Sequence, residues 1–268
     1  MHDGFVDIHC HLLPGVDDGS PDWETSLAMA QMAVADGTRT IIVTPHQLGN
    51  FSQNRGDPIR QLTGQLQAAI RQHEIPLEIM PGADVRIEDI MIGLLDSGEV
   101  LSLGDKRRHV LLELPHELYF PLEGVLADLN RRGMAGILSH PERNHGILRE
   151  PELLPTLVDA GCLMQVTAGS LMGTFGPHSQ QLAEWMLGQG LVHFIATDAH
   201  GVKSRRPLMR RAFERVASLV DQETALDLCE RNPALVARGD SVLVGQRTLP
   251  RRGWKRFFST RKAGRCAA

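Results

Sequence analysis

The amino-acid sequence predicts an α/β protein in which seven parallel strands form a closed or nearly closed (β/α)7 barrel. Short apolar, β-branched runs alternate with longer stretches of helical periodicity, seven times over about 240 residues. Such alternation is typical of a parallel sheet. The alternative is an open, doubly wound sheet, which would need a glycine-rich first turn. The first turn is His9-Cys10-His11 and contains no glycine, so the barrel is favoured.

The strands and helices follow from these runs in chain order. The strand-like runs span residues 5–8, 40–43, 77–80, 110–113, 135–138, 162–166 and 192–196. Ser20-Pro21 predicts an N-cap with proline in the first turn, opening a helix that extends to about Ala35. A second helix opens at Asp57-Pro58 and extends to about His73. The remaining helices are expected near residues 120–132, 150–160, 177–189, 206–218 and 222–231, the last one before Asn232-Pro233.

Composition is that of a soluble globular protein, because 42% of the residues are hydrophobic and 22% are charged. No apolar run approaches the roughly 20 residues that a membrane-spanning helix requires. Residues 1–5 contain neither a basic nor an apolar segment, so we expect no signal peptide and a cytoplasmic protein. The cysteines form no C-x-x-C pair, which argues against a disulfide framework or a zinc ribbon.

Charge divides the chain into two parts. The net charge is −4, but residues 247–268 contain eight Lys or Arg and no acidic residue. Residues 1–246 therefore carry about −12, and an acidic body is unsuited to nucleic acid. We interpret residues 1–246 as one barrel domain and residues 247–268 as a basic tail. The tail is either a solubilising extension or a docking segment for an anionic membrane surface or an acidic partner, since aromatic side chains lie among its basic ones.

Side chains that can bind metal ions follow six of the seven predicted strands. They are His9 and His11 after the first strand, His46 after the second, Asp84 after the third, Glu113 at the end of the fourth, His140 after the fifth, and Asp198 and His200 after the seventh. In a barrel these strand ends meet at one mouth, where active sites are built. Side chains two residues apart on a strand point the same way, so His9 and His11 can reach one ion, as can Asp198 and His200.

The number and kind of these residues indicate the metals. Five histidines and several carboxylates exceed what one tetrahedral ion uses, so we expect two or three ions. Imidazole and carboxylate ligands without thiolate suit manganese, iron or zinc in a hydrolytic site. A single H-x-H pair is more often an ordinary surface or core feature. Glu113, however, lies inside an apolar strand, where an unpaired carboxylate is costly. The repetition from strand to strand therefore favours a metal centre.

Five motifs surround these residues. They are Asp7-Ile8-His9-Cys10-His11, Val16-Asp17-Asp18-Gly19, Thr44-Pro45-His46, His140-Pro141-Glu142-Arg143 and Thr197-Asp198-Ala199-His200. Together they resemble the PHP (polymerase and histidinol phosphatase) superfamily over roughly residues 5–240. With Ser204-Arg205, they resemble more narrowly the bacterial protein tyrosine phosphatases of capsule and exopolysaccharide loci. The resemblance implies a distorted (β/α)7 TIM-like barrel of PHP type, in a single domain, with a trinuclear site that often holds manganese.

The resemblance also implies a ligand set. It consists of His9, His11, Asp18, His46, Asp84, Glu113, His140, Asp198 and His200. The family usually has glutamate, which is one methylene longer, where this chain has Asp84. The choice of Asp18 over Asp17 rests on the alignment of the motif alone.

The expected reaction is phosphoester hydrolysis by direct attack of a metal-bound hydroxide. Two ions about 3.5–4 Å apart would hold a bridging hydroxide and lower its pKa. Arg143 and Arg205 are the candidates for binding the non-bridging phosphate oxygens, because guanidinium groups match phosphate bidentately, and Arg206 is the alternative to Arg205. Together with Asp18, Arg143 and Arg205 form the candidate catalytic set.

A cysteine nucleophile is not expected. Cysteine-dependent tyrosine phosphatases carry C-x5-R, and Cys266 lies too near the end for that motif. Six residues after Cys10, Cys162 and Cys229 stand Val16, Ala168 and Leu235. Two aromatic residues after strand ends, Tyr119 and Phe175, either line the mouth and contact an aromatic substrate or pack against neighbours, and packing is favoured.

The leading hypothesis is a metal-dependent phosphotyrosine-protein phosphatase acting on a tyrosine autokinase of capsule or exopolysaccharide synthesis. The alternatives are a small-molecule phosphatase of histidinol-phosphatase type, a related PHP phosphoesterase, an amidohydrolase, and a metal-binding regulatory subunit without activity. Amidohydrolases commonly bridge two ions with a carboxylated lysine after the fourth strand, where this chain has Glu113. A nuclease is disfavoured by the acidic body.

Overall fold

The computed structural model of this chain describes residues 4–242. The expected boundary at residue 246, the basic tail 247–268 and Cys266 lie outside the described residues. Cys10, Cys162 and Cys229 are buried and carry free thiols. Among the described residues, no helix combines the length and the hydropathy that crossing a membrane requires.

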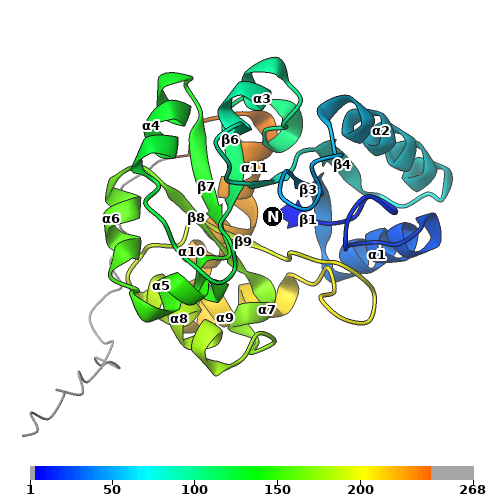
Figure 1. The fold of residues 1–268 in the computed structure, drawn as a ribbon. Helices are drawn as coiled ribbons and strands as arrows, with labels where there is room; N and C mark the ends of the chain where they lie inside the picture. Colours follow the sequence, from blue (N-terminus) through cyan, green and yellow to red (C-terminus); the bar gives the residue numbers. More distant parts are fainter. Residues whose placement is uncertain (1–3, 243–268) are drawn as a thin grey trace, which may run out of the picture.

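Parallel strands form the centre of the molecule in two hydrogen-bonded groups (Figure 1). The first group contains β1 (Phe5–Cys10), β2 (Thr38–Val43) and β4 (Glu78–Pro81). The second contains β3 (His46–Gln47), β5 (Asp84–Arg86), β6 (His109–Glu113), β7 (Ala135–Ser139), β8 (Leu163–Thr167) and β9 (Phe194–Ala196). β3 and β5 follow β2 and β4 after two-residue interruptions, and β2 pairs with β4 as β3 pairs with β5. The two groups are therefore joined, and seven strand paths result.

The barrel closes between its first and last strands. Cys10 and Ala199 form a parallel bridge, the His11 amide donates to the Ala199 carbonyl at 2.9 Å, and the Asp198 amide donates to the His9 carbonyl at 2.7 Å. These contacts lie at the carboxyl end of β1 and just after β9. The predicted distorted (β/α)7 barrel is confirmed, and the open doubly wound alternative is wrong because such a sheet would leave β1 and β9 apart.

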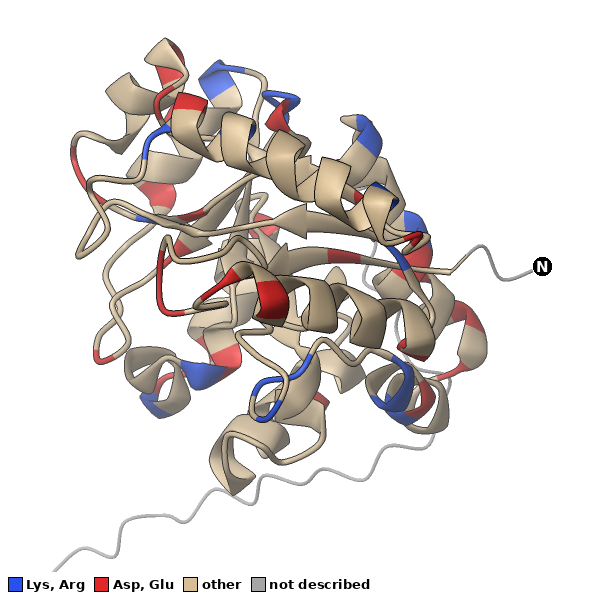
Figure 2. Cartoon of the chain, turned by 90° about the vertical axis from the view of Figure 1, so that its right-hand side faces the viewer, with Lys and Arg blue, Asp and Glu red and all other residues tan. Residues whose placement is uncertain are grey.

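Helices cover the outside of the barrel. The expected ones are α1 (Trp23–Asp36), α2 (Gly56–Gln72), α4 (Glu123–Arg131), α6 (Leu153–Asp159), α8 (Pro177–Gly188), α9 (Arg210–Leu219) and α10 (Gln222–Leu226). Figure 2 shows the side on which α1 and α2 lie across the strands, with basic and acidic residues interspersed over its surface. The sequence did not predict β3, β5, α3 (Met91–Ser97), α5 (His145–Arg149) and α7 (Ala168–Leu171), which are all short.

Three predicted helix boundaries differ from the structure. The N-cap of α1 is Asp22, whose carboxylate accepts from the Thr25 amide at 2.8 Å, while the Ser20 hydroxyl hydrogen-bonds within the preceding loop. α9 begins at Arg210, four residues later than expected. The chain also does not leave helical structure at Pro233, because α11 (Asn232–Arg238) follows directly from a π-helical turn, Asp227–Arg231. Proline lacks an amide proton and is tolerated in a first turn, and the wider turn accommodates it.

The inside of the barrel is filled from its amino end. Apolar side chains from the strands pack there on residues of α11 and of the 3-10 turn Leu103–Asp105; the cluster includes Val6, Ile8, Ile42, Leu103, Leu111, Ile137, Leu163, Phe194 and Val236. α11, orange in Figure 1, lies behind the strands in that view. The amino end is therefore closed by a packed apolar cluster, and the carboxyl end is left for polar side chains.

Candidate active site

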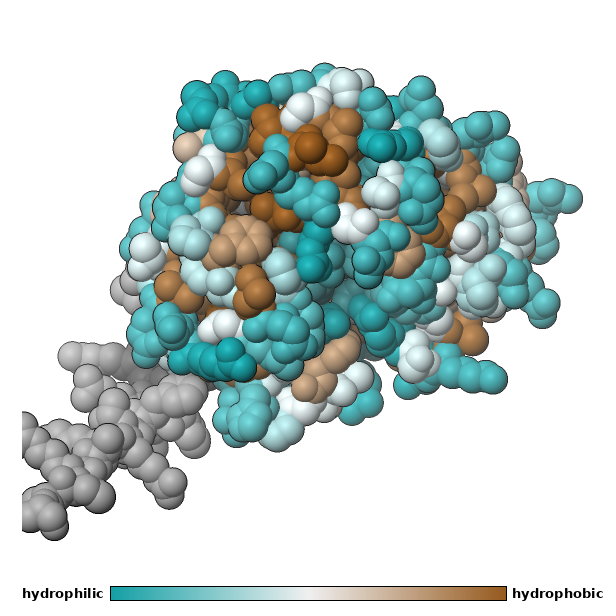
Figure 3. All heavy atoms as spheres, in the orientation of Figure 1, coloured by the Kyte–Doolittle hydropathy of each residue, from teal (hydrophilic) through white to brown (hydrophobic). Residues whose placement is uncertain are grey.

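All nine predicted ligands meet at the carboxyl end of the barrel. Their nitrogen and oxygen atoms form four overlapping groups, each with ligand atoms within 4.8 Å of one another. The groups are His11, Asp18, His46 and His200; His9, His11 and Asp84; His9, His140 and Asp198; and His46, Asp84 and Glu113. A further group of His116, Glu117 and His145 shares no residue with them. Figure 3 views this end of the barrel, where hydrophilic residues line a central hollow.

His9 and His11 lie at the centre of the four groups. Their Nε2 atoms are 3.3 Å apart, and Asp198 Oδ1 lies 3.2 Å from His9 Nε2 and 3.4 Å from His11 Nε2. The pairing register of β1 shifts between Asp7 and Cys10. This shift allows Ile8 to pack in the inner cluster while His9, the next residue, also reaches the barrel interior. Cys10 packs in the outer core instead.

The outward-facing nitrogens of these two histidines are held by hydrogen bonds. His9 Nδ1 lies 2.8 Å from Gln165 Oε1, and His11 Nδ1 lies 2.7 Å from Asp17 Oδ2. A carboxylate only accepts, so His11 Nδ1 carries a proton, and when Nε2 gives up its own proton to bind an ion, the Nε2 lone pair faces the centre. Burial lowers the pKa of His11, but the charges of Asp17 and Asp198 outweigh it and raise that pKa to about 10.

Asp17 and Asp18 have different surroundings. Asp17 is buried and accepts from His11 Nδ1 and from the amides of Gly19 and His46, both at 3.0 Å. Asp18 is half-exposed, and its Oδ1 lies 3.4 Å from both His46 Nε2 and His200 Nε2. The structure thus places Asp18 among the potential ligands, as the motif implied. It gives Asp17 a supporting role that the sequence did not indicate.

Asp84 belongs to two of the four groups. Its Oδ2 lies 3.6 Å from His9 Nε2 and 3.4 Å from His46 Nδ1, and neither carboxylate oxygen has a hydrogen-bond partner although both are buried. A buried, unbonded carboxylate is costly unless cations neutralise it. Burial raises its pKa, but His9 and His46 outweigh that effect and hold the pKa well below its usual range. Asp84 is therefore ionised and has two free oxygens, which fits a ligand shared by two cations.

Glu113 and His46 extend the site beyond Asp84. Glu113 Oε2 lies 3.7 Å from His46 Nδ1 and 3.5 Å from Arg86 Nη1. Burial, and then the charge of Asp84, raise the pKa of Glu113 to about 7. One nitrogen of His46 faces these carboxylates and the other faces Asp18, and its ring stacks on Phe51 at 5.3 Å. The two carboxylates and the imidazole are thus close together, and a bound divalent ion would reduce the repulsion between the carboxylates.

Arg143 and Arg205 both reach the site, whereas Arg206 is exposed and forms no ion pair with a carboxylate of the described residues. Each of the first two donates a hydrogen bond to Asp198 Oδ2. Their guanidinium groups lie over the Phe175 ring, at 4.1 Å for Arg143 and 6.0 Å for Arg205. The Nε atoms of both arginines are buried and have no partner. Two donors are therefore available beside the centre for an anionic group.

Three site residues have left-handed backbone conformations. His140, Asp198 and Arg205 have φ of 34°, 50° and 46°. Non-glycine residues adopt this region at a cost, and such residues concentrate at functional sites. Here each one redirects the chain at or beyond a strand end, so that its side chain faces the centre.

Several supporting residues were not predicted. Gln165 is a buried amide in the apolar strand β8. A polar side chain inside an apolar strand was the signal that identified Glu113, and it could have identified Gln165 too. Asp7 is buried and accepts from the amides of His9 and Thr197, at 3.2 and 3.0 Å, and from the Thr197 hydroxyl. Burial raises the pKa of Asp7 to about 6. Glu142 accepts from the Thr167 amide and the Ser170 hydroxyl, so it connects loops rather than facing the centre.

The two aromatic candidates, Tyr119 and Phe175, have different surroundings. Tyr119 packs on the core, and its backbone lies so close to Gly146 that a Cβ there would be 2.4 Å from the Tyr119 nitrogen. Phe175 instead lies beneath the two site arginines. Tyr119 is therefore a packing residue in the structure, and Phe175 borders the site.

Comparison with known proteins adds the family. The family model described as "Capsular polysaccharide synthesis, CpsB/CapC" matches residues 5–238. The chain belongs to the CpsB/CapC family. This membership confirms the resemblance that the motifs carried. It also covers every predicted ligand.

Relatives of this CpsB/CapC chain include two named phosphatases. The tyrosine-protein phosphatase YwqE of Bacillus subtilis is 39% identical over 202 residues, which are 75% of this chain and 79% of that protein. The putative tyrosine-protein phosphatase CapC of Staphylococcus aureus is 31% identical over 209 residues, which are 78% of this chain and 82% of that protein.

Solved structures agree with the family. A crystal structure from work on YwqE of Bacillus subtilis and CpsB of Streptococcus pneumoniae, described as metal-dependent tyrosine phosphatases, has a TM-score of 0.86 and 33% identity, and the match covers 93% of this chain and all of that one. The phosphotriesterase homology protein of Escherichia coli has a TM-score of 0.58 at 11% identity, covering 87% of this chain and 98% of that one. The second likeness concerns the barrel fold alone.

Proposed function

We propose that this chain is a metal-dependent phosphotyrosine-protein phosphatase, a phosphoric monoester hydrolase. The observation that carries the proposal is the joint placement of nine imidazole and carboxylate side chains beside two arginines whose buried Nε atoms have no partner. The relatives support the substrate class, because YwqE and CapC are named tyrosine-protein phosphatases.

The donor set fits divalent metal ions. The orphaned, ionised Asp84 and the unpartnered Nε2 of His200 are atoms that an ion would satisfy. We propose that the nine residues hold two or three ions, with Mn2+ as the first candidate and iron or zinc as alternatives. When bound, such ions lower the pKa of a coordinated water towards neutrality and neutralise charge on the phosphate. Asp84 is the candidate for the ligand that two ions share.

Arg143 and Arg205 are proposed to bind the phosphoryl oxygens. A guanidinium matches phosphate through paired N–H donors, and positioning with charge neutralisation is most of what phosphoryl transfer requires. Their shared contact with Asp198 keeps both groups at the edge of the centre. Both guanidinium groups also lie over the Phe175 ring, so the two arginines are positioned before a substrate binds.

Asp18 is proposed to hold a cation rather than to transfer a proton. The imidazole of His200, whose Nε2 lies 3.4 Å away, together with the charge of His46, lowers the pKa of Asp18 far below the usual range. Asp18 is therefore ionised at neutral pH and cannot protonate a leaving phenolate. Its half-exposed position beside His46 and His200 supports a role at the rim of the metal-binding group.

The cysteines among the described residues are unsuited to act as nucleophiles. Burial raises the pKa of the Cys162 thiol to about 12 and raises those of Cys10 and Cys229 further above the usual range. A thiol kept protonated and enclosed reacts slowly, because the thiolate is the nucleophile. This supports hydrolysis by water rather than through a cysteinyl phosphate.

The biological setting follows from the family. Its description is capsular polysaccharide synthesis, and we propose that the substrate is a tyrosine autokinase of capsule or exopolysaccharide synthesis. We also propose a cytoplasmic location for this chain. The partner and the location both depend on the phosphatase activity.

The test compares two substrates and two variants. The full chain, purified with Mn2+, is given a phosphotyrosine peptide and histidinol phosphate. We expect faster turnover of the peptide, with the rate lost in His140→Ala and kept in His73→Ala, an exposed histidine at the end of α2. Preference for histidinol phosphate would assign the chain to the small-molecule phosphatases. Full metal loading with no hydrolysis would instead leave a metal-binding subunit.

A further inference from the structure

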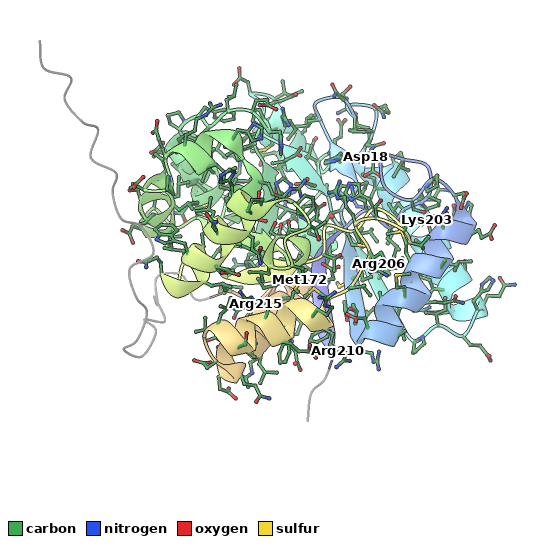
Figure 4. All side chains as sticks on the ribbon, turned by 90° about the horizontal axis from the view of Figure 1, so that it is seen from below. Asp18, Met172, Lys203, Arg206, Arg210 and Arg215 are labelled. Atoms are coloured by element: carbon green, nitrogen blue, oxygen red, sulfur yellow. The ribbon has the colours of Figure 1, made fainter. Side chains whose placement is uncertain are left out.

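Four exposed cations occur within residues 203–211, in the segment after β9. They are Lys203, Arg206, Arg210 and Arg211, and we call them the basic ridge. None of the four forms an ion pair with a carboxylate of the described residues. Figure 4 shows Lys203, Arg206 and Arg210 on one face of the molecule, with Asp18 of the site at the edge of that face.

This segment contrasts with the rest of the surface. Residues 4–242 contain 20 Lys or Arg and 31 Asp or Glu, since eight basic residues lie in 247–268 and Asp3 is outside, so their net charge is −11. Elsewhere most arginines contact a carboxylate; examples are Arg55, Arg60, Arg86, Arg132, Arg231 and Arg238. A run of unpaired cations on an acidic protein is a local positive field that attracts anionic partners.

Two cations of the ridge stand at the start of α9, where positive charge lowers the stability of the helix. Arg210 and Arg211 occupy the first turn of α9, which contains no acidic residue. Cations at a helix N-terminus add to the positive end of the helix dipole and lower stability. Asp36 offsets part of this by accepting from the amides of Met209 and Arg210, at 2.5 and 2.7 Å. Arg210 also lies over the Phe5 ring, at 5.8 Å from its centroid, so an intramolecular contact accounts for Arg210 but not for Arg211.

The ridge is fixed relative to the active site by its own backbone. The His200 amide donates to the Arg205 carbonyl at 2.8 Å, which closes the loop that carries Lys203 at its tip. Arg205 has φ of 46° and turns its side chain inwards to Asp198, whereas the next residue, Arg206, is exposed. Adjacent arginines thus face the phosphate-binding side and the outer surface. The phosphate-binding side and the exposed ridge are therefore joined at successive residues of the chain.

We propose that the basic ridge binds an acidic segment of the polypeptide that carries the phosphotyrosine. The inference rests on the proposed phosphatase function. An extended peptide advances about 3.3 Å per residue, so carboxylates a few positions from the phosphotyrosine reach Lys203 and Arg206. The ridge thereby selects substrates by charge outside the site itself. The effect is on capture of the substrate and not on the chemical step, because none of its four residues contacts the metal-binding groups.

The experiment uses the metal-loaded full chain and two phosphotyrosine peptides of equal length. One peptide has Asp and Glu around the phosphotyrosine, and the other has Asn and Gln at the same positions. The test variant is Lys203→Glu with Arg206→Glu, and the control is Arg71→Glu, an exposed arginine at the far end of α2. An aryl phosphate without a peptide reports the chemistry alone, and the tail is the same in all proteins.

The expected result is a kcat/KM about tenfold higher for the acidic peptide in the original chain and in Arg71→Glu at low salt, the lower end of electrostatic steering. The double variant should lose this preference while its rate on aryl phosphate is unchanged. High salt should remove the preference in all proteins, because exposed charges are screened. Equal rates on both peptides in the original chain, or an undiminished preference in the double variant, would overturn the proposal.

Two further outcomes are distinguished. Binding to vesicles containing phosphatidylserine that the double variant loses, with both peptides hydrolysed equally, would assign the ridge to a membrane surface and overturn the peptide proposal. Absence of aryl phosphate hydrolysis in the original chain would instead contradict the phosphatase function. In that case fluorescence anisotropy of the same two peptides still tests the ridge: tighter binding of the acidic one, lost in the double variant, supports it, and equal binding overturns it.

Discussion

The two ends of the barrel are built in opposite ways. At the amino end, Leu111, Ile137 and Phe194 pack with Val236 of α11 into a closed apolar cluster. At the carboxyl end, imidazoles and carboxylates are buried together, and Asp84 is left without a hydrogen bond. Packing stabilises a fold, whereas a crowd of unpaired charges costs stability. The amino end therefore stabilises the barrel, whereas the carboxyl end holds the reactive groups at a cost in stability.

The largest effect is expected from neutralising Asp84. Asp84→Asn removes the charge that the two neighbouring groups share, so activity on a phosphotyrosine peptide should fall by more than about a hundredfold, the upper end for a residue that only supports a metal ligand. The free energy of unfolding of metal-free protein should change little, because the loss of attraction to His9 and His46 opposes the gain from no longer burying a charge. Steady-state kinetics and denaturant unfolding measure the two. Asp84→Glu, which keeps the charge, is the control and should retain more activity; a simultaneous loss of stability in Asp84→Asn would break the comparison.

A core truncation at the other end should do the reverse. Ile137→Ala removes a fully buried side chain of the inner cluster, so the free energy of unfolding should fall by about 2–5 kcal/mol. The number of ions bound per folded chain should stay the same. Denaturant unfolding and elemental analysis check this, with Ile137→Val as the conservative control. Loss of metal at full folding would show that the two ends are not independent.

A smaller effect is expected from Asp17. Asp17→Asn weakens the hold on His11 Nδ1 but leaves the predicted ligands in place, so kcat/KM should fall about 10- to 100-fold. Metal affinity, followed by titration, should weaken in parallel. If Asp17→Asn were as inactive as Asp18→Asn and lost the same ions, Asp17 would itself be a ligand.

The smallest effect concerns the histidines at the amino end. Burial lowers the pKa values of His109 and His193 to about 4, and His193 Nδ1 accepts from the Met164 amide, which requires a neutral ring. The unfolded chain protonates these rings below about 6.5, and the folded chain only below about 4. Since the unfolded state then binds more protons, the free energy of unfolding should fall as pH falls through this window.

His193→Gln tests that expectation. Its unfolding free energy should depend less steeply on pH between about 6.5 and 4 than that of the original chain. Denaturant unfolding at several pH values gives the slopes. Equal slopes in both proteins would mean that His193 is protonated at the same pH in the folded and unfolded states.

Sequence reasoning found the barrel and the mouth because both follow from periodicity. Alternating strands and helices force the strand ends together, so His9, His46 and Asp198 could be predicted as neighbours without knowing distances. The short elements β3 and β5 were missed, since two or three residues carry no period. The helix through Pro233 was missed because a π-helical turn before it accommodates the proline.

The division of roles within the site was less accessible. Asp17 and Asp18 are adjacent and chemically identical, and only the fold shows that one faces His11 and the other faces His46 and His200. The inward turn of Arg205, beside the exposed Arg206, likewise depends on a left-handed backbone conformation of Arg205 that the sequence does not signal. The identity of each ligand remains a prediction that metal analysis tests.

The most direct test of the account is a manganese titration of chelator-treated full chain. Bound Mn2+, by elemental analysis, and hydrolysis of a phosphotyrosine peptide are followed together. We expect activity to appear as two to three ions bind per chain, and we expect Asp84→Asn to bind fewer ions and stay inactive. Full activity with one ion or none, or hydrolysis unaffected by Asp84→Asn, would contradict a multinuclear phosphatase at the barrel mouth.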